Sequence, residues 1–188
     1  MKRNLGLFTF AVSSLLSVAS MAQDTGSDNH TITVKVPEVA ILDLHSSESA
    51  LDFDASFVQT SPLEAGTKIT DAEDNSNTWL NYSSILKDGG VESRHIDVKA
   101  SEVVPGIAIK VTAGSATGGK GTLGGSDGTV TLTVEDQSIV SAIGSAYTED
   151  GPNKGHQLTY VFEALDDNYG DLLAKDYAVQ VTYTLADN

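Results

Sequence analysis

Two glycine-rich stretches in the middle of the chain match the spelling of catalytic or phosphate-binding motifs. Gly114-Ser-Ala-Thr-Gly-Gly-Lys120 fits the first seven positions of a phosphate-binding loop, but Gly121 stands where a metal-binding Ser or Thr is needed. Gly124-Gly-Ser-Asp-Gly128 fits the Gly-x-Ser-x-Gly pattern of a nucleophilic serine. Both chemistries need a helix directly after the motif, and the residues that follow favour a strand. We therefore predict a flexible loop here and no enzymatic activity.

Acidic loops are the better candidates for a bound ion. Hard cations such as Ca²⁺ take carboxylate and carbonyl oxygens from loops. One acidic loop spans residues 71–77, and the second holds Asp166, Asp167, Asn168 and Asp171. We favour the second loop as a Ca²⁺ site because Gly170 lets the backbone wrap closely; an acidic turn without an ion is the alternative.

Zinc and sugar sites receive less support from the sequence. The four histidines, His30, His45, His95 and His156, are isolated, and no cysteine is present to join them. Sugar binding usually needs exposed aromatic side chains. Trp79 and Tyr82 lie on opposite faces of one expected strand, so one of them could be exposed, although a core tryptophan is the simpler interpretation.

Charge and composition limit the partners of the chain. Its 188 residues include 26 acidic and 11 basic side chains, with a formal net charge of −15. Such a charge repels nucleic acid and anionic lipid, so neither is an expected partner. Without cysteine there is no disulfide framework, and stability must come from core burial, a metal ion or neighbouring subunits.

The N-terminal residues read as an export signal. Lys2 and Arg3 precede an apolar run shorter than a membrane span needs, and small residues stand at the expected cleavage site after Ala22. We expect residues 1–22 to be a signal peptide, 23–30 a flexible polar tail and 31–188 a single domain. The predicted product is secreted, periplasmic in transit, then at the cell surface or outside the cell, without a membrane anchor.

Period-two alternation predicts strands through most of the remaining chain. It is clearest in Tyr177–Leu185, where Tyr177, Val179, Val181 and Tyr183 share one face. The run from Leu51 to Phe57 alternates as well, and Val39–Leu42 is apolar on both faces, as in a strand covered on both sides. Ser138–Tyr147 fits a strand or a helix, and its glycine and serines favour the strand; Asp127-Gly128, directly before another alternating run, predicts a hairpin. Nine or ten such short strands, separated by turns and with no long amphipathic helix, predict an all-β protein. We expect an antiparallel two-sheet β-sandwich, similar to immunoglobulin or pilin domains, with a distorted β-barrel as the alternative.

The segment Thr31–Val36 has two possible partners. Ile32, Val34 and Val36 alternate strictly, follow the polar tail and precede Pro37, which interrupts strand pairing. The segment is either the first strand of its own domain or a strand that pairs with a neighbouring molecule. In the second case, Ile32, Val34 and Val36 would be interaction residues, together with the apolar face of Tyr177–Leu185.

The last predicted strand, by its alternation and its position at the chain end, resembles the last strand of bacterial fimbrial subunits. That resemblance covers about a tenth of the chain and implies a pilin-like domain that associates with itself or with other surface subunits. The chain differs from classical chaperone–usher subunits, which usually carry a disulfide. We expect a non-catalytic structural subunit of a surface filament, fimbria or extracellular matrix; the alternative is a secreted glycan- or calcium-binding module.

Overall fold

The computed structural model describes residues 26, 27 and 29–188. The expected signal peptide and the beginning of the polar tail lie outside this range. The chain divides into two units, Met1–Lys35 and Val36–Asn188, and every strand among the described residues belongs to the second. Among the described residues, no helix has the length and apolar character to cross a membrane.

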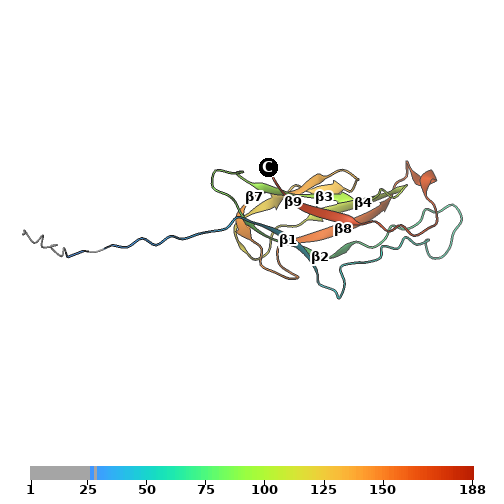
Figure 1. The fold of residues 1–188 in the computed structure, drawn as a ribbon. Coiled ribbons are helices and arrows are strands. Elements are labelled where there is room, and N and C mark those ends of the chain that lie inside the picture. The colour runs from blue at the N-terminus through green and yellow to red at the C-terminus, as the bar shows by residue number, and fades with distance from the viewer. Residues whose placement is uncertain (1–25, 28) are drawn as a thin grey trace, which may run out of the picture. The chain divides into compact units, whose positions relative to one another are not determined.

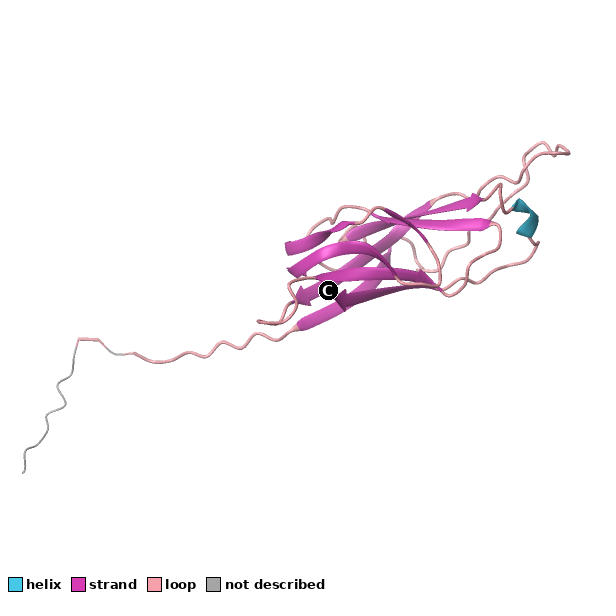
Figure 2. Ribbon diagram, turned by 90° about the horizontal axis from the view of Figure 1, so that it is seen from above, coloured by secondary structure: helices cyan, strands magenta, loops and turns pink. Residues whose placement is uncertain are grey.

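Nine strands and a single helical turn make up the second unit. The strands are β1 (Val39–Ser46), β2 (Asn75–Ile85), β3 (Arg94–Ala100), β4 (Ile107–Ala113), β5 (Lys120–Ser126), β6 (Thr129–Thr131), β7 (Gln137–Tyr147), β8 (His156–Ala164) and β9 (Val181–Asp187). The helical turn, η1, spans Tyr169–Asp171 and is the small cyan element in Figure 2. The prediction of an all-β protein is therefore confirmed.

The strands form one antiparallel sheet in the order β6-β4-β8-β2-β7-β3-β9, with β1 added to β2 and β5 added to β7. Strands β7 and β2 each pair with three other strands, and β2 is labelled beside β1 in Figure 1. Strand β2 uses both of its edges. On one edge it pairs with β1 over the whole of β1. On the other edge its first half pairs with β8, and Ser83 and Ser84 pair with β7. The sheet is not closed on itself.

Alternating apolar residues build the core, as the sequence predicts. In β3 and β8 every second residue is buried, including Ile96, Val98, Leu158 and Tyr160. This is the pattern of a strand with one face turned to the core. The buried cluster consists of Ala72, Leu80, Tyr82, Ile96, Val98, Ala100, Val111, Ala113, Leu132, Ile139, Val140, Ile143, Leu158, Tyr160, Phe162 and Tyr183.

Two sequence-based expectations about strands are wrong. The alternating run from Leu51 to Phe57 forms no strand, although Phe53 lies against Tyr160 with ring centroids 5.4 Å apart. The hairpin expected at Asp127-Gly128 is also absent, because β5 pairs with β7 and β6 pairs with β4. Turn residues indicate where the chain reverses, but they do not decide which neighbour the next strand joins.

Arg94 fixes the point where the chain enters the sheet. Its side chain is 3 % exposed and forms ion pairs with Glu38 (2.8 Å) and Asp187 (2.7 Å). The same guanidinium donates to the carbonyl oxygen of Val39 at 2.5 Å and to the hydroxyl of Ser84 at 3.2 Å. A buried guanidinium needs this full set of acceptors. Arg94 therefore holds the start of β1 against the ends of β2 and β9.

Candidate functional site

The residues that precede β1 expose a row of apolar side chains. Residues 31–36 belong to no strand. Ile32, Val34 and Val36 are 74 %, 79 % and 70 % exposed. The interpretation of this segment as the first strand of its own domain is therefore wrong. Isolated exposed apolar residues are ordinary, whereas three in strict alternation have the spacing of one face of a strand.

The last strand begins later than the sequence predicts. Strand β9 begins at Val181, whereas the alternation begins at Tyr177. Residues 177–180 belong to no strand. The backbone of Gln180 contacts Ser101: its amide donates to the Ser101 hydroxyl, and its carbonyl accepts from the Ser101 amide. Alternation predicted the face correctly, but a strand also needs a neighbour to pair with.

The predicted interaction residues of this strand lie against the core. Val179 and Val181 are partly buried and pack on the core cluster. Tyr183 is 9 % exposed, and its hydroxyl lies 2.7 Å from that of Tyr160. Burial raises the pKa of both tyrosines, so the pair stays neutral. Tyr177 is half-buried, and its hydroxyl is buried without a hydrogen-bond partner in the described structure.

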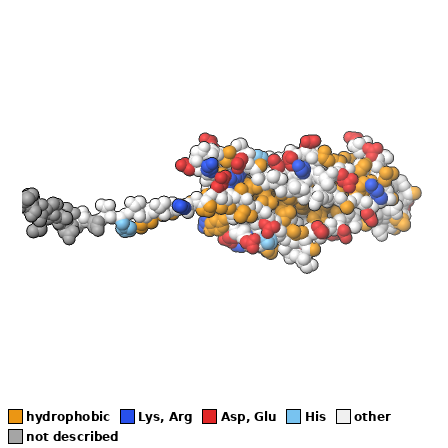
Figure 3. Space-filling view, viewed as in Figure 1, with side chains coloured by type: hydrophobic (Ala, Val, Ile, Leu, Met, Phe, Trp, Pro, Cys, Tyr) orange, Lys and Arg blue, Asp and Glu red, His pale blue; other side chains and the backbone are white. Residues whose placement is uncertain are grey.

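The outer edge of β9 is open. Strand β9 is at one end of the strand order and pairs with β3 alone, so its other edge has no strand partner within residues 29–188. An open edge presents unpaired N–H and C=O groups to another strand. Apolar and acidic side chains are interspersed over the face of the molecule shown in Figure 3. The chain thus contains both an unpaired segment of alternating apolar residues and a sheet edge without a strand partner.

The proposed calcium ligands are engaged in local contacts. Asp166 accepts a hydrogen bond from Lys68 at 2.6 Å, and this bond raises the pKa of Lys68. The side-chain amide of Asn168 donates to Asp171 at 3.3 Å. Among the described residues, the carboxylates of this loop do not form a group of three potential ligands whose atoms all lie within 4.8 Å of one another. Calcium binding by Asp166, Asp167, Asn168 and Asp171 stays a prediction.

The glycine-rich motifs are built into the sheet. Lys120–Ser126 forms β5, and the next element is β6, so neither motif leads into a helix. The hydroxyl of Ser126 accepts a hydrogen bond from the amide of Gly128 at 3.1 Å. The expected flexible loop is thus partly a strand. Trp79 and Tyr82 are both buried, at 7 % and 4 % exposed, and only Tyr82 belongs to the main core cluster.

Sequence reasoning missed one group of side chains. His45 is isolated in the sequence, yet in the structure it lies beside Asp43 and Asp150. The Asp43-x-His45 spacing is the only sequence signal, since it puts both side chains on one face of a strand. Asp150 is 105 residues from His45 and reaches it only through the pairing of the strands.

Comparison with protein-family models, curated proteins and solved structures finds no match to this chain. Any function must therefore be argued from the geometry of the chain itself.

Proposed function

We propose that this chain is a non-catalytic structural subunit of a secreted bacterial filament, fimbria or extracellular matrix, whose copies join by β-strand exchange. One observation carries the proposal: Ile32, Val34 and Val36 alternate along an unpaired segment and are each at least 70 % exposed. A second copy of the chain is the proposed occupant, because each copy has both a free segment and an open edge at β9.

The energy of such a contact is sufficient to hold copies together. Burying each of these three side chains contributes about 1.5–3 kcal/mol, and together roughly 5–9 kcal/mol before the cost of ordering the segment. Main-chain hydrogen bonds along a sheet edge add affinity, while alternate side chains provide specificity. Within one copy this contribution is not realised, since all three side chains face solvent.

The outer edge of β9 is the proposed acceptor. A strand added there would also extend the ladder over residues 177–180, which already alternate but pair with no strand. Under this proposal Tyr177 and Val179 become strand residues only in the assembled form. The late start of β9 in the single chain supports this choice of edge over those of β1, β5 and β6.

The finer architecture that suits this assembly is a two-layer sandwich. One layer would hold β6-β4-β8-β2-β1 and the other β5-β7-β3-β9, continuous where β2 changes partner from β8 to β7. The hydroxyl contact between Tyr160 of β8 and Tyr183 of β9 supports two facing layers. In such an arrangement the edge strand β9 flanks the core, so an added strand reaches apolar side chains.

The test compares oligomeric state across a matched pair of variants. In one variant Ile32, Val34 and Val36 are changed to Asp; in the control, Thr31 and Thr33, two polar residues of the same segment, are changed to Ala. We expect the wild-type chain and the control to assemble with rising concentration in light scattering and electron microscopy, and the Asp variant to stay monomeric and folded. Equal assembly by both variants, or no assembly by the wild type at any concentration, contradicts the proposal.

A second measurement locates the acceptor. Hydrogen exchange should show new amide protection in residues 177–179 and in Val181 in the assembled form, because that edge gains a partner strand. The amide of Gln180 is not part of this test, since it already donates to Ser101 in the single chain. A chain lacking residues 23–36 should fold, fail to assemble alone, and gain the same protection from a peptide of residues 29–38. New protection confined to β5 or β6 would leave strand exchange standing but overturn β9 as the acceptor.

A further inference from the structure

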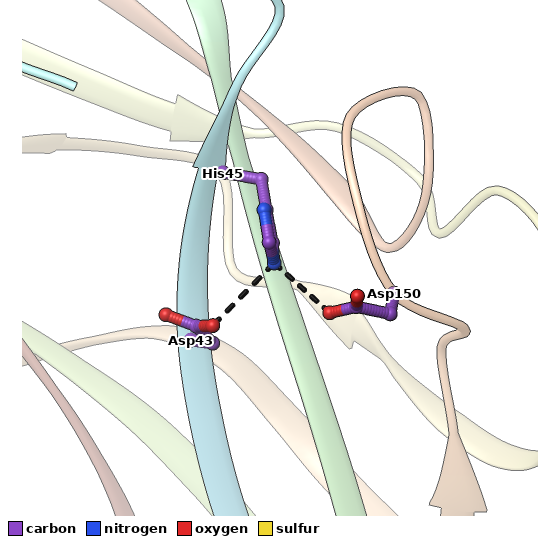
Figure 4. Close-up of side chains that lie close together, drawn as sticks. All are labelled: Asp43, His45 and Asp150. Atoms are coloured by element: carbon purple, nitrogen blue, oxygen red, sulfur yellow. Dashed lines mark hydrogen bonds and ion pairs between the residues drawn. The ribbon is translucent and has the colours of Figure 1, made fainter. Parts of the chain in front are cut away.

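Three potential metal ligands meet beside β1 (Figure 4). The His45 Nε2 atom lies 3.4 Å from Asp43 Oδ2 and 2.9 Å from Asp150 Oδ1. All three ligand atoms lie within 4.8 Å of one another, and no other group of His, Cys, Asp and Glu side chains within the described range converges in this way. The cluster combines one imidazole with two carboxylates that come from separate parts of the chain.

The fold holds these side chains in place. Asp43 and His45 are two residues apart on β1, so they project from the same face. Asn81 of β2 is paired with Asp43 and is 4 % exposed. Its side chain accepts from the amide of Gly151 at 2.8 Å and donates to the carbonyl of Lys154 at 2.7 Å. Asn81 thus ties the β7–β8 loop, which carries Asp150, to the strand next to β1.

Asp43 is oriented before any ion binds. The amide of Leu44 donates to its Oδ1 atom at 2.8 Å, so the Oδ2 atom is the one turned toward His45. The side chains of Asp43 and Asp150 are 67 % and 88 % exposed, and that of His45 is 29 % exposed. An ion can therefore reach the cluster directly from solvent and keep water in its remaining coordination positions.

The ligand types and distances in this cluster suit a bound cation. A single imidazole nitrogen faces two carboxylates, but it can donate only one proton to them. Metal–ligand bonds of about 2.0–2.2 Å in a tetrahedral site separate neighbouring ligand atoms by roughly 3.3–3.6 Å. The Nε2–Oδ2 distance of 3.4 Å already fits, and the 2.9 Å distance needs to open only by about half an ångström.

We propose that Asp43, His45 and Asp150 form a binding site for a divalent transition-metal ion of the Zn²⁺ class, which joins the β7–β8 loop to β1. One nitrogen and two oxygens suit Zn²⁺ better than Ca²⁺, which takes oxygen ligands alone. Water completes the coordination. The site lies apart from the acidic loop at Asp166, and it does not depend on the assembly proposal.

The test titrates the untagged full chain with Zn²⁺ by isothermal calorimetry at pH 7.5, with a matched pair of histidine variants. His95 is the control because it also lies beside an aspartate: its Nε2 atom is 3.2 Å from Asp97 Oδ2. Unlike His45, it does not belong to a described group of three potential metal ligands. We expect one saturable site in the wild type and in His95→Ala. In His45→Ala and in Asp150→Asn, Zn²⁺ affinity should fall at least about tenfold.

Further readouts separate a built site from an ion pair. Binding should weaken on acidification, since the imidazole must be unprotonated to bind the ion, and excess Ca²⁺ should not displace Zn²⁺. Zn²⁺ should also slow hydrogen exchange in residues 149–155. Asp150 is exposed, so Asp150→Asn keeps the test valid if His45→Ala fails to fold. Absent saturable binding, or binding that survives both variants, overturns the proposal and leaves an ordinary ion pair.

Discussion

At the scale of single residues, His156 is a titratable side chain buried in the fold. It is fully buried, and its Nδ1 atom donates to the carbonyl of Gly114 at 2.7 Å. Its ring stacks on Tyr82, with centroids 5.8 Å apart. Burial lowers the pKa of His156, an effect partly offset by the nearby carbonyls of Gly114 and Leu123. The neutral imidazole is therefore the form that the core accepts.

That lowered pKa sets the direction of a pH dependence. The unfolded chain binds a proton at His156 near the ordinary pKa of about 6.5, whereas the folded chain resists it. The contribution of neutral His156 to the free energy of unfolding is therefore fully present above about pH 6.5, and it is lost progressively as the pH drops below that value. We expect the His156→Asn variant, whose side-chain amide can still donate to Gly114, to be less stable than the wild type. Its stability should change less with pH between pH 7 and 5, because it lacks the imidazole. Melting temperatures measured across that range decide; parallel curves for the two proteins contradict the prediction.

At the scale of elements, β5 depends on glycine to lie beside β7. Gly121 pairs with Ala146 and has a φ of 93°, in the left-handed region that favours glycine. A Cβ atom there would collide with the backbone carbonyl of Ser145. Gly125, in the same strand, has open space around the position of a Cβ atom. The two glycines therefore form a matched pair in one element.

We expect Gly121→Ala to lower the free energy of unfolding by about 1–3 kcal/mol, through backbone strain and the clash with β7. Gly125→Ala should change it by no more than about 0.5 kcal/mol. Urea denaturation of both variants measures the difference. Equal stability of the two would show that β5 can move away from β7 at no cost.

The elements also show how far alternation alone predicts a fold. It succeeds for β3 and β8, where one face is buried throughout. It is ambiguous for β7, because Ile139, Ile143 and Tyr147 share one face of either a helix or a strand. The segment is a strand, as predicted, and Ala142 at φ 58° shifts the phase of its buried residues between Val140 and Ile143. It fails for β1, expected to be covered on both faces, where Ile41 is 62 % exposed at the sheet edge. Alternation of apolar and polar residues indicates which side chains of a strand share a face, but it does not indicate which strands lie beside it.

At the scale of the whole molecule, pairing brings together what sequence separates. The Asp43–His45–Asp150 cluster exists because β1 lies on β2 and Asn81 of β2 holds the loop that follows β7. No spacing rule connects His45 with a residue 105 positions away. The alternation of Thr31–Val36 and Pro37 after it, by contrast, set this segment apart in the sequence, but they left open whether it pairs within its own domain or with a neighbouring molecule.

The net charge of the molecule should influence the protein concentration at which copies assemble. Removal of residues 1–22, which include Lys2 and Arg3 and no acidic residue, takes the formal charge from −15 to −17. Copies of such a chain repel one another over the Debye length, which falls from about 30 Å at 0.01 M salt to about 10 Å at 0.1 M. The apolar contact proposed for Ile32, Val34 and Val36 has no such dependence on salt.

Assembly should therefore begin at a lower protein concentration in 150 mM NaCl than in 10 mM, because screening removes the repulsion and leaves the apolar contact intact. Light scattering over a protein dilution series at both salt concentrations measures the shift, with sucrose at matched osmolality as the control for non-ionic effects. The variant with Asp at positions 32, 34 and 36 should stay monomeric at either salt concentration. Assembly that weakens as NaCl rises would mean that ion pairs, rather than an exchanged apolar strand, hold the copies together.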